Sequence, residues 1–462
     1  MTQVQDITSS MTRLEKRATV SLAGIYALRM LGLFMIMPVL PLFAEQLVGS
    51  TPLLIGLSVS IYGLSQALLQ IPFGLMSDRF GRKKLIVIGL LLFSAGSIVA
   101  AMSTTIYGVL LGRALQGSGA IAAVIMALVA DLTQEVHRTK AMALIGVSIG
   151  ISFGIAISIG PIIAASFGIE GIFWLTAVLS ATAIGVIVYF VPDPKQSKIH
   201  RDAELIPSQM TDVLKNNELL KFNYGIFVLH FILTASFIVI PLAMKEVGLQ
   251  GSQHGQVYLP VFVVALLTAI PFIIIAEKKR KMKPVFIGAV VVIAVSELGF
   301  LLFHQNLTGI IGFLWLFFAG FNLLEATLPS LVSKTAPGDM KGTAMGFYST
   351  AQFLGAFLGG AIGGWSYGEF GFAGVFLLGA AIAASWLLIA WTMKPPRYVA
   401  NLLISIENLS KDRAEQLVDE MLEIAGVEEV TLHFGEGVAY LKVDNQQLDK
   451  NRLQDSLTQF KA

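Results

Sequence analysis

Cysteine is absent from the 462-residue chain, and only 13% of its residues carry charge. Without cysteine there is no disulfide, no thiolate metal site and no cysteine nucleophile. A water-soluble protein of this length needs more charge on its surface, whereas 55% of this chain is hydrophobic, so the composition predicts a membrane protein. A glycine-rich phosphate loop ending in Lys-Ser or Lys-Thr is also missing, which argues against ATP hydrolysis. We expect no enzyme, no cofactor, no metal and no nucleic-acid partner.

Long apolar runs occupy most of the first 393 residues. A helix needs about 20 apolar residues to cross a bilayer, and a barrel strand needs only about half as many. The runs therefore predict helices, because a lipid-exposed backbone must satisfy its own hydrogen bonds. Twelve spans are expected in an all-α membrane fold, at residues 18–44, 52–77, 84–103, 106–131, 140–166, 171–191, 219–245, 255–276, 284–303, 308–333, 342–367 and 372–393.

Lysine and arginine gather in alternate loops between these spans. They precede the first span and follow the second, fourth, eighth and tenth, whereas the intervening loops hold almost none, Lys245 excepted. The positive-inside rule then places both termini in the cytoplasm.

A polar stretch that begins at Val191 divides the spans into six and six. We predict a cytoplasmic tail at 1–17, a six-helix bundle at 18–191, a cytoplasmic linker at 192–218, a second six-helix bundle at 219–394 and a cytoplasmic domain at 398–462. Residues 208–217 of the linker are expected to form a short amphipathic helix.

The two halves contain matching segments. Segments 71–82 and 270–281 share Ile-Pro-Phe followed by an acid–base pair and a further base, at a constant offset of 199, and segments 128–131 and 331–334 also match. These matches indicate an internal repeat. The alternative is chance similarity between apolar helices.

The C-terminal residues 398–462 have a different character. From Ala400 onward there are twelve Asp and Glu against six Lys and Arg. Patterning predicts strands at 402–406, 427–434 and 438–443, helices at 410–425 and 446–460, and a hairpin turn at 435–437. The order β-α-β-β-α is the start of a ferredoxin-like fold with a missing or very short closing strand. This domain could self-associate, bind a cytoplasmic ligand or gate the membrane part; a solvated spacer is the alternative.

The loop between the second and third spans is short, charged and punctuated by glycine. Gly74 would let another helix approach closely, and Gly81 permits a tight turn. Asp78 falls at the end of a helix, where the dipole disfavours an anion, so it needs a nearby cation or the N-terminus of another helix. Arg79 and Arg82 follow directly.

Asp131 closes the fourth span on the same side as Arg82. We predict an Asp78–Arg82–Asp131 charge cluster that takes part in gating, because such contacts can be made in one conformation and lost in another. A solvated surface network of little energetic weight is the alternative.

The pattern Gly74-x-x-x-Asp78-Arg79-x-Gly81-Arg82-Lys83 resembles the signature of the major facilitator superfamily. Arg113 to Gly119 is similar to a second signature of that family. In the fifth span, Gly160-Pro161 and the glycines before it resemble the family's antiporter motif, although alanine stands at three positions where glycine is usual: Ala156, Ala164 and Ala165. With its tail the chain resembles the YajR-type group, which implies a twelve-helix carrier of the cell inner membrane and drug efflux.

The tail also resembles heavy-metal-associated domains in its helix and hairpin. Those domains hold metal through two cysteines after the first strand, and residues 408–413 offer none. Copper or zinc delivery through that motif is therefore not expected.

Ionisable residues inside spans are costly and suggest function. Glu325 lies mid-span, where it could take up a proton in one facing state and release it in the other; a permanently protonated, hydrogen-bonded acid is the alternative. His230 suits proton exchange near neutral pH, or it is a neutral helix contact. Glu297 is a weaker candidate, because it could simply reach the membrane interface.

Two arginines lie within the first-half spans. Arg113 precedes Gln116 by three residues on one helix face, and the family resemblance implies a buried cation that tunes a proton site; a structural pair is the alternative. Arg29 could contact an anionic partner, or its side chain could extend to the cytoplasmic face.

A substrate cavity is expected at the midplane between the halves. The residues we place there are Arg29, Met30, Phe34, Met37, Gln116 and Asn322. Methionine and phenylalanine would make this cavity apolar and adaptable, whereas lipid-facing packing is the alternative for each of them.

The sequence thus predicts a secondary transporter that works by proton-coupled antiport of small amphiphilic or apolar compounds. Its partners would be the lipid bilayer, protons and the small-molecule substrate. Two alternatives remain: a proton-driven uptake symporter for a metabolite, and a membrane sensor that signals through its C-terminal domain.

Overall fold

The computed structural model describes residues 11–194, 206–396, 398, 400–405, 411–433, 438–444, 447–449, 451–453 and 455–456. Within these ranges, ten helical segments are long and apolar enough to cross a membrane. They comprise α1 (Arg13–Met35) with α2 (Leu40–Phe43), α3 (Pro52–Phe80), α4 (Arg82–Ala101), α5 (Ile106–Ser118) with α6 (Ala122–Leu132), α7 (Glu135–Tyr189), α9 (Asn217–Glu246), α10 (His254–Lys278), α11 (Met282–Phe303), α12 (Leu307–Thr335) and α13 (Lys341–Trp391).

Helices α7 and α13 each make two crossings. Their backbone leaves the helical conformation at Gly168 (φ 67°) and Gly371 (φ 64°), which only glycine adopts easily. The Ser148 hydroxyl contacts the Ala23 carbonyl and the Thr176 hydroxyl contacts the Gly32 carbonyl, so the second part of α7 returns along α1. Eight single and two double segments give twelve spans among the described residues, which confirms the predicted fold class.

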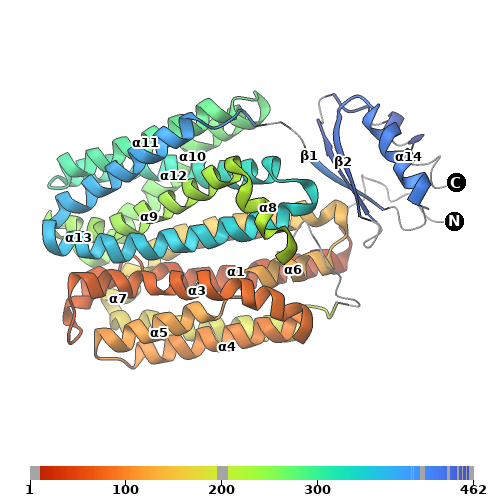
Figure 1. Ribbon diagram of the computed structural model, residues 1–462. Coiled ribbons are helices and arrows are strands. Elements are labelled where there is room, and N and C mark those ends of the chain that lie inside the picture. Colours follow the sequence, from red (N-terminus) through yellow and green to blue (C-terminus); the bar gives the residue numbers. More distant parts are fainter. Residues whose placement is uncertain are drawn as a thin grey trace.

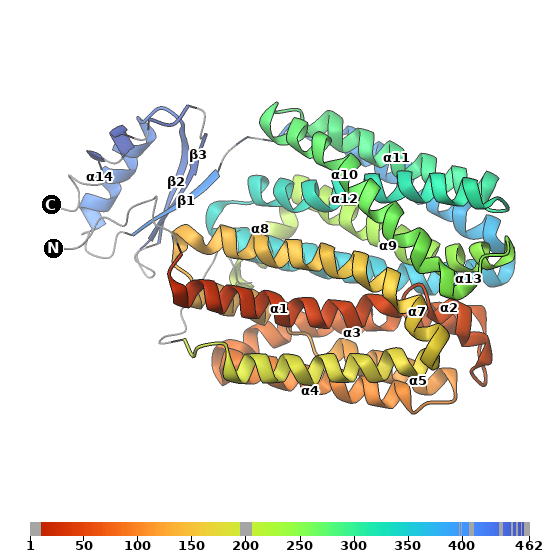
Figure 2. The same ribbon diagram turned by 180° about the vertical axis from the view of Figure 1, so that it is seen from behind.

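The spans form two groups that lie side by side (Figure 1). Helices α1–α7 make up one group and α9–α13 the other, and Figure 2 shows the same division from behind. Between them in the chain lie η2 (Pro207–Gln209) and α8 (Met210–Lys215), so the helix predicted in the linker is present. Three further 3₁₀ turns are η1 (Ala44–Gln46), η3 (Gly251–Gln253) and η4 (Gly338–Met340).

The C-terminal domain contains a three-stranded antiparallel sheet. Its strands are β1 (Ala400–Ser405), β2 (Val427–His433) and β3 (Val438–Val443), in the order β1-β3-β2, with α14 (Lys411–Leu422) between β1 and β2. Strands β1 and β2 run parallel on either side of β3, which is the split β-α-β unit of a ferredoxin-like fold. The predicted turn at 435–437 and most of the helix predicted at 446–460 lie outside the described residues, although 451–453 and 455–456 are helical.

One face of this sheet packs on its own helix. Leu417 and Met421 of α14 are buried against Leu441 and Val443 of β3 and Ile404 of β1. The domain lies at the end of the helical bundle that also carries the α3–α4 and α10–α11 junctions (Figure 1). We call this the basic end, after the Lys and Arg residues in those junctions.

Candidate transport site

The α3–α4 junction is a one-residue turn. Gly81 ends α3 and begins α4 with φ 96° and ψ 131°, a left-handed conformation that a side chain would strain. The turn places Arg82 on α4 beside two acids. Its guanidinium forms an ion pair with Asp78 (Nη1 to Oδ1, 3.1 Å) and a second, buried pair with Asp131 of α6.

The predicted charge cluster is thus assembled in one place. Arg82 and Asp131 are almost fully buried, whereas the Asp78 side chain is 40% exposed. Arg79 points elsewhere and lies over the ring of Phe80 at 5.8 Å. The cluster is therefore no solvated surface network, because its central ion pair is shielded from water.

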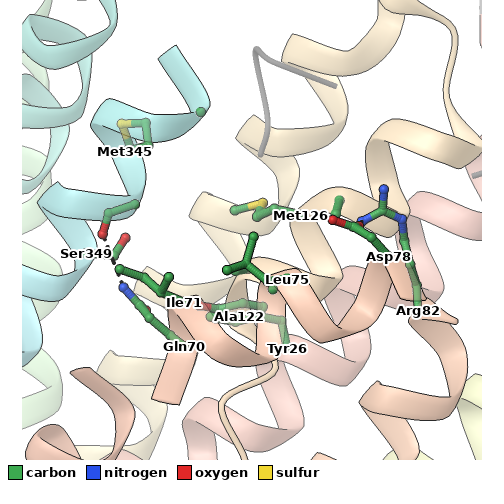
Figure 3. Close-up of a pocket in the computed structure, with 15 residues that line it drawn as sticks. Tyr26, Gln70, Ile71, Leu75, Asp78, Arg82, Ala122, Met126, Met345 and Ser349 are labelled. Carbon is green, nitrogen blue, oxygen red and sulfur yellow. Dashed lines mark hydrogen bonds and ion pairs between the residues drawn. The ribbon is translucent and has the colours of Figure 1, made fainter. Parts of the chain in front are cut away.

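A pocket separates Asp78 from the second group of helices at the basic end. Figure 3 shows Leu75 and Asp78 of α3 and Met126 of α6 on one side, and Met345 and Ser349 of α13 on the other. Gly74 also lines this pocket, and a Cβ placed there would meet only the Ala123 side chain at 3.6 Å, an ordinary contact. The close helix approach expected at Gly74 is absent in this conformation.

The second half has an unequal counterpart to this cluster. Glu277 of α10 forms an ion pair with Lys334 of α12 and accepts a hydrogen bond from Ser330 (2.6 Å). The offset of 199 relates Glu277 to Asp78, but a lysine at 334 replaces the second acid. In the second half, the negative charge of Glu277 is therefore balanced directly by Lys334, without an arginine between two acids.

A central cavity lies deeper between the halves. Met30, Phe34 and Met37 line it from the first half, as predicted. His230 of α9 and Gln352 of α13 line it from the second half. Its wall is mostly apolar, with a few polar groups, as in many small-molecule sites.

His230 is placed between two possible partners. Its Nε2 lies 2.8 Å from the side-chain amide of Gln352 and 3.6 Å from Oε1 of Glu325 on α12. A neutral ring can accept a hydrogen bond from the amide at Nε2, whereas a protonated ring would donate from Nε2 to the carboxylate. The geometry therefore joins two of the predicted proton-site residues to a third, Gln352, that sequence reasoning missed.

Arg113 also lines the cavity, and its guanidinium is satisfied mainly by carbonyl groups. It donates to the backbone oxygens of Ser58 (3.2 Å) and Val59 (3.0 Å) and to the side chain of Gln116 (2.8 Å). The pairing with Gln116 follows the predicted spacing. Gln116 itself is fully buried, donates to Ser97 (2.7 Å), and does not line the cavity where we expected it.

The structure contradicts the predicted extension of Arg29 to the cytoplasmic face, whereas its predicted contact with an anionic partner stays a prediction. Arg29 is 1% exposed, so its side chain does not extend to the membrane surface. Its guanidinium donates hydrogen bonds to the Gln66 side chain (2.7 Å) and the Gly119 carbonyl (2.9 Å). Buried inside the first group of helices, it does not line the central cavity, and neither does Asn322. Both of these Arg29 hydrogen bonds lie within its own bundle, and the spacing of residues in the sequence cannot reveal such partners.

Glu297 differs from its prediction as well. It does not reach the interface, because it is fully buried inside the second group of helices. Its Oε1 accepts a hydrogen bond from Ser236 of α9 (2.9 Å), and its other oxygen lies where a side chain on Gly379 would be. It therefore joins α9, α11 and α13 away from the central cavity.

At the end opposite the basic end, α3 and α13 are in close contact. This contact is made through glycines that sequence reasoning did not single out. A Cβ on Gly360 or Gly364 of α13 would collide with Gly56 or with the Pro52 carbonyl on α3. The signal was available as the paired glycines at 359–360 and 363–364, four residues apart on one helix. In α7, Gly160 of the antiporter-like motif, followed by Pro161, packs directly on the Met35 backbone.

No group of three His, Asp or Glu residues in the described part of the chain could hold a metal ion. The model for the Major Facilitator Superfamily matches residues 22–360 and, in a second match, 283–418. The chain belongs to this superfamily. It is therefore a membrane transporter that crosses the bilayer many times, and not an enzyme.

Three comparisons show what this superfamily member resembles. It is 46% identical to "Inner membrane transport protein YajR" of Escherichia coli (strain K12), over 97% of this chain and 99% of the relative. It is 28% identical to "Multidrug resistance protein 2" of Bacillus subtilis (strain 168), over 77% and 92% of the two chains. A crystal structure of a bacterial homolog of the human lysosomal transporter Spinster, inward-facing and occupied, aligns with a TM-score of 0.66 and 13% identity, over 83% of this chain and 98% of that one. This structural likeness supports the fold.

Proposed function

We propose that this transporter exports small amphiphilic or apolar compounds in exchange for protons. The observation that carries the proposal is the mostly apolar central cavity with His230 at its wall and Glu325 3.6 Å from the His230 ring. The name of the Bacillus relative, a multidrug resistance protein, supports the same substrate class.

Proton coupling is assigned to His230, Glu325 and Gln352. The ring nitrogen has an amide on one side and a carboxylate on the other, so protonation changes which partner it binds. A ligand can drive a conformational change only if its affinity differs between the two states. Protonation of this pair supplies such a difference, and Arg113 on the facing wall adds a fixed positive charge.

The Asp78–Arg82–Asp131 cluster is assigned to gating. In this conformation a pocket separates Asp78 from the start of α13. Closing the basic end would bring the carboxylate toward a helix N-terminus, where a negative charge is favoured. The cluster would then stabilise the closed basic end and be weakened when that end opens.

The inner membrane is the proposed location, with both termini in the cytoplasm. Two observations support it: the distribution of Lys and Arg among the loops and the name of the Escherichia coli relative. The basic end is then the cytoplasmic end, and the cavity of this conformation lies on the cytoplasmic side of the closed glycine contacts.

Dye uptake into everted vesicles, which corresponds to export from the cell, tests the proposal. An amphiphilic fluorescent dye should accumulate in vesicles that carry the protein when their lumen is acidic, and accumulation should stop when an ionophore collapses the pH gradient. Dye movement in the opposite direction would favour the symporter instead. Equal dye signals with and without the protein, across a panel of dyes, would contradict the proposed substrate class.

A further inference from the structure

The outer face of the C-terminal sheet is buried along its central strand, β3, although its own helix covers only the inner face. Side chains alternate along β3, so Ala439 and Leu441 face α14 while Tyr440 and Lys442 face away. Yet Tyr440 is only 4% exposed and Lys442 only 7% exposed. Tyr440 packs on η4, where a Cβ on Gly338 would lie 3.1 Å from the Tyr440 Cβ.

A second contact fixes the same face to the α10–α11 junction. Arg280 forms an ion pair with Asp444, which follows β3 (Nη2 to Oδ1, 2.6 Å). The ring centre of Tyr398, just before β1, lies 5.4 Å from the Arg280 guanidinium and 5.3 Å from the Lys334 ammonium. The Tyr398 hydroxyl accepts a hydrogen bond from the Met282 backbone (2.9 Å). These residues connect the domain to three elements of the second half.

Arg280 has an unusual backbone. With φ 54°, it is the one non-glycine residue with positive φ in the described part of the chain. The offset of 199 that relates the two halves pairs Arg280 with Gly81, which has φ 96°. The first half thus uses glycine for this turn, whereas the second half keeps a strained arginine whose side chain reaches Asp444. A residue in this conformation persists only where its surroundings hold it.

We propose that the outer face of the C-terminal sheet is a docking surface for the α10–α11 junction and η4, and that docking restrains the alternating-access movement. The domain also touches the first half, because β1 lies beside the start of α7 (Figure 2). A single rigid domain in contact with both halves at the basic end must lose one contact when the halves rock. The restraint rests on the proposed transport cycle, whereas the docking does not.

A disulfide tests the docking directly, because the natural chain has no cysteine. The variant Gly338→Cys/Tyr440→Cys places two Cβ atoms about as close as a disulfide requires, after a shift of a few tenths of an ångström. Oxidation in native membranes should link the two positions within one chain. The control Gly338→Cys/Glu423→Cys, with the second cysteine on an exposed residue beyond α14, should stay unlinked. Failure to link the first pair, or links only between two chains, would overturn the proposal.

The restraint is measured on the same variant. Oxidation should slow dye efflux by about tenfold or more, reversibly on reduction, which is ~1.4 kcal/mol or more on the barrier. Hydrogen exchange at residues 338–346 should fall on oxidation as well, whether or not a dye is transported. If the disulfide forms and both exchange and efflux are unchanged, the restraint is refuted. If the wild type exports no dye but exchange falls, the proposed function fails while the docking stands.

The variant Arg280→Gly provides an independent check. Glycine keeps the left-handed turn without strain and removes the ion pair with Asp444. The disulfide of the Gly338→Cys/Tyr440→Cys pair should then form more slowly, because docking is weakened. An unchanged rate would show that Arg280 does not anchor the domain and would contradict this part of the proposal.

Discussion

At the scale of single residues, the role of an ionisable side chain depends on whether it is buried between packed helices or lies beside the central cavity. Arg29 and Glu297 are buried between packed helices and do not line the central cavity, whereas Arg113 and His230 line it and His230 contacts Glu325. Sequence reasoning identified each of these ionisable residues as unusual. It could not place Arg29 or Glu297, because which neighbour satisfies a buried charge depends on the packing of distant helices.

The variant Glu325→Gln tests the proton site. Glutamine keeps the size of the side chain but cannot ionise, so proton-driven dye export should fall by about tenfold or more, a loss of ~1.4 kcal/mol or more in the coupled step. Dye binding measured by fluorescence should remain. The matched control Glu369→Gln changes an exposed residue of α13 and should transport normally. Full proton-driven export by Glu325→Gln would remove Glu325 from the mechanism.

The variant Arg82→Ala tests the gating cluster. It leaves the buried carboxylate of Asp131 without its arginine. This loss should destabilise the conformation that contains the Arg82–Asp131 ion pair by about 3 kcal/mol. Transport should drop steeply while the protein still inserts and runs as a single species in detergent. The offset of 199 relates Arg82 to Lys281, so Lys281→Ala is the matched control. It alters an exposed side chain and should leave transport nearly unchanged. Comparable losses in both variants would mean that general loop charge, rather than the cluster, matters.

At the scale of elements, the spans and the tight turn at Gly81 were predictable, whereas the chain reversals at Gly168 and Gly371 were not. Twelve apolar runs fixed twelve crossings, but the fifth and sixth runs join through Gly168 alone, and the fourth breaks between Ser118 and Ala122. An apolar run indicates a segment that is buried in lipid. A one-residue reversal of the chain direction depends instead on a single glycine with positive φ. The strand β3 was predicted at its observed bounds, because alternation within a half-buried sheet is a strong signal.

The glycine contact between α3 and α13 leads to an element-scale prediction. The variant Gly360→Val adds bulk where Gly56 and Ser60 approach, which should cost about 1–3 kcal/mol in the conformation with this end closed. Transport should be lost because the halves can no longer close there. Gly312→Val, at an exposed glycine of α12 with open space around it, is the control for membrane insertion. Wild-type transport by Gly360→Val would show that this contact is not part of the cycle.

At the scale of the whole molecule, a carrier of two unequal halves is joined to a domain that contacts both. The sequence predicted the domain and the order of its strands and helices along the chain, but left its role open among several. The docking depends on contacts of Tyr398, Tyr440 and Asp444 with segments that are distant in the sequence. A local sequence pattern therefore could not predict it.

Removal of residues 398–462 separates carrier from sensor. The helical bundle alone should still transport, and faster than the full chain if the domain restrains it. Initial rates of dye efflux at equal protein amounts in the membrane measure this directly. Absence of transport in both forms would favour the sensor alternative.

Proton flux in proteoliposomes tests whether the transporter exchanges protons for an amphiphilic compound through one cavity. Vesicles containing the purified protein and an internal pH dye receive an outward gradient of the transported dye, with no initial pH gradient. Proton-coupled antiport predicts internal acidification that requires the dye gradient and is lost in Glu325→Gln. Dye efflux without any proton movement, or acidification that persists in Glu325→Gln, would contradict it.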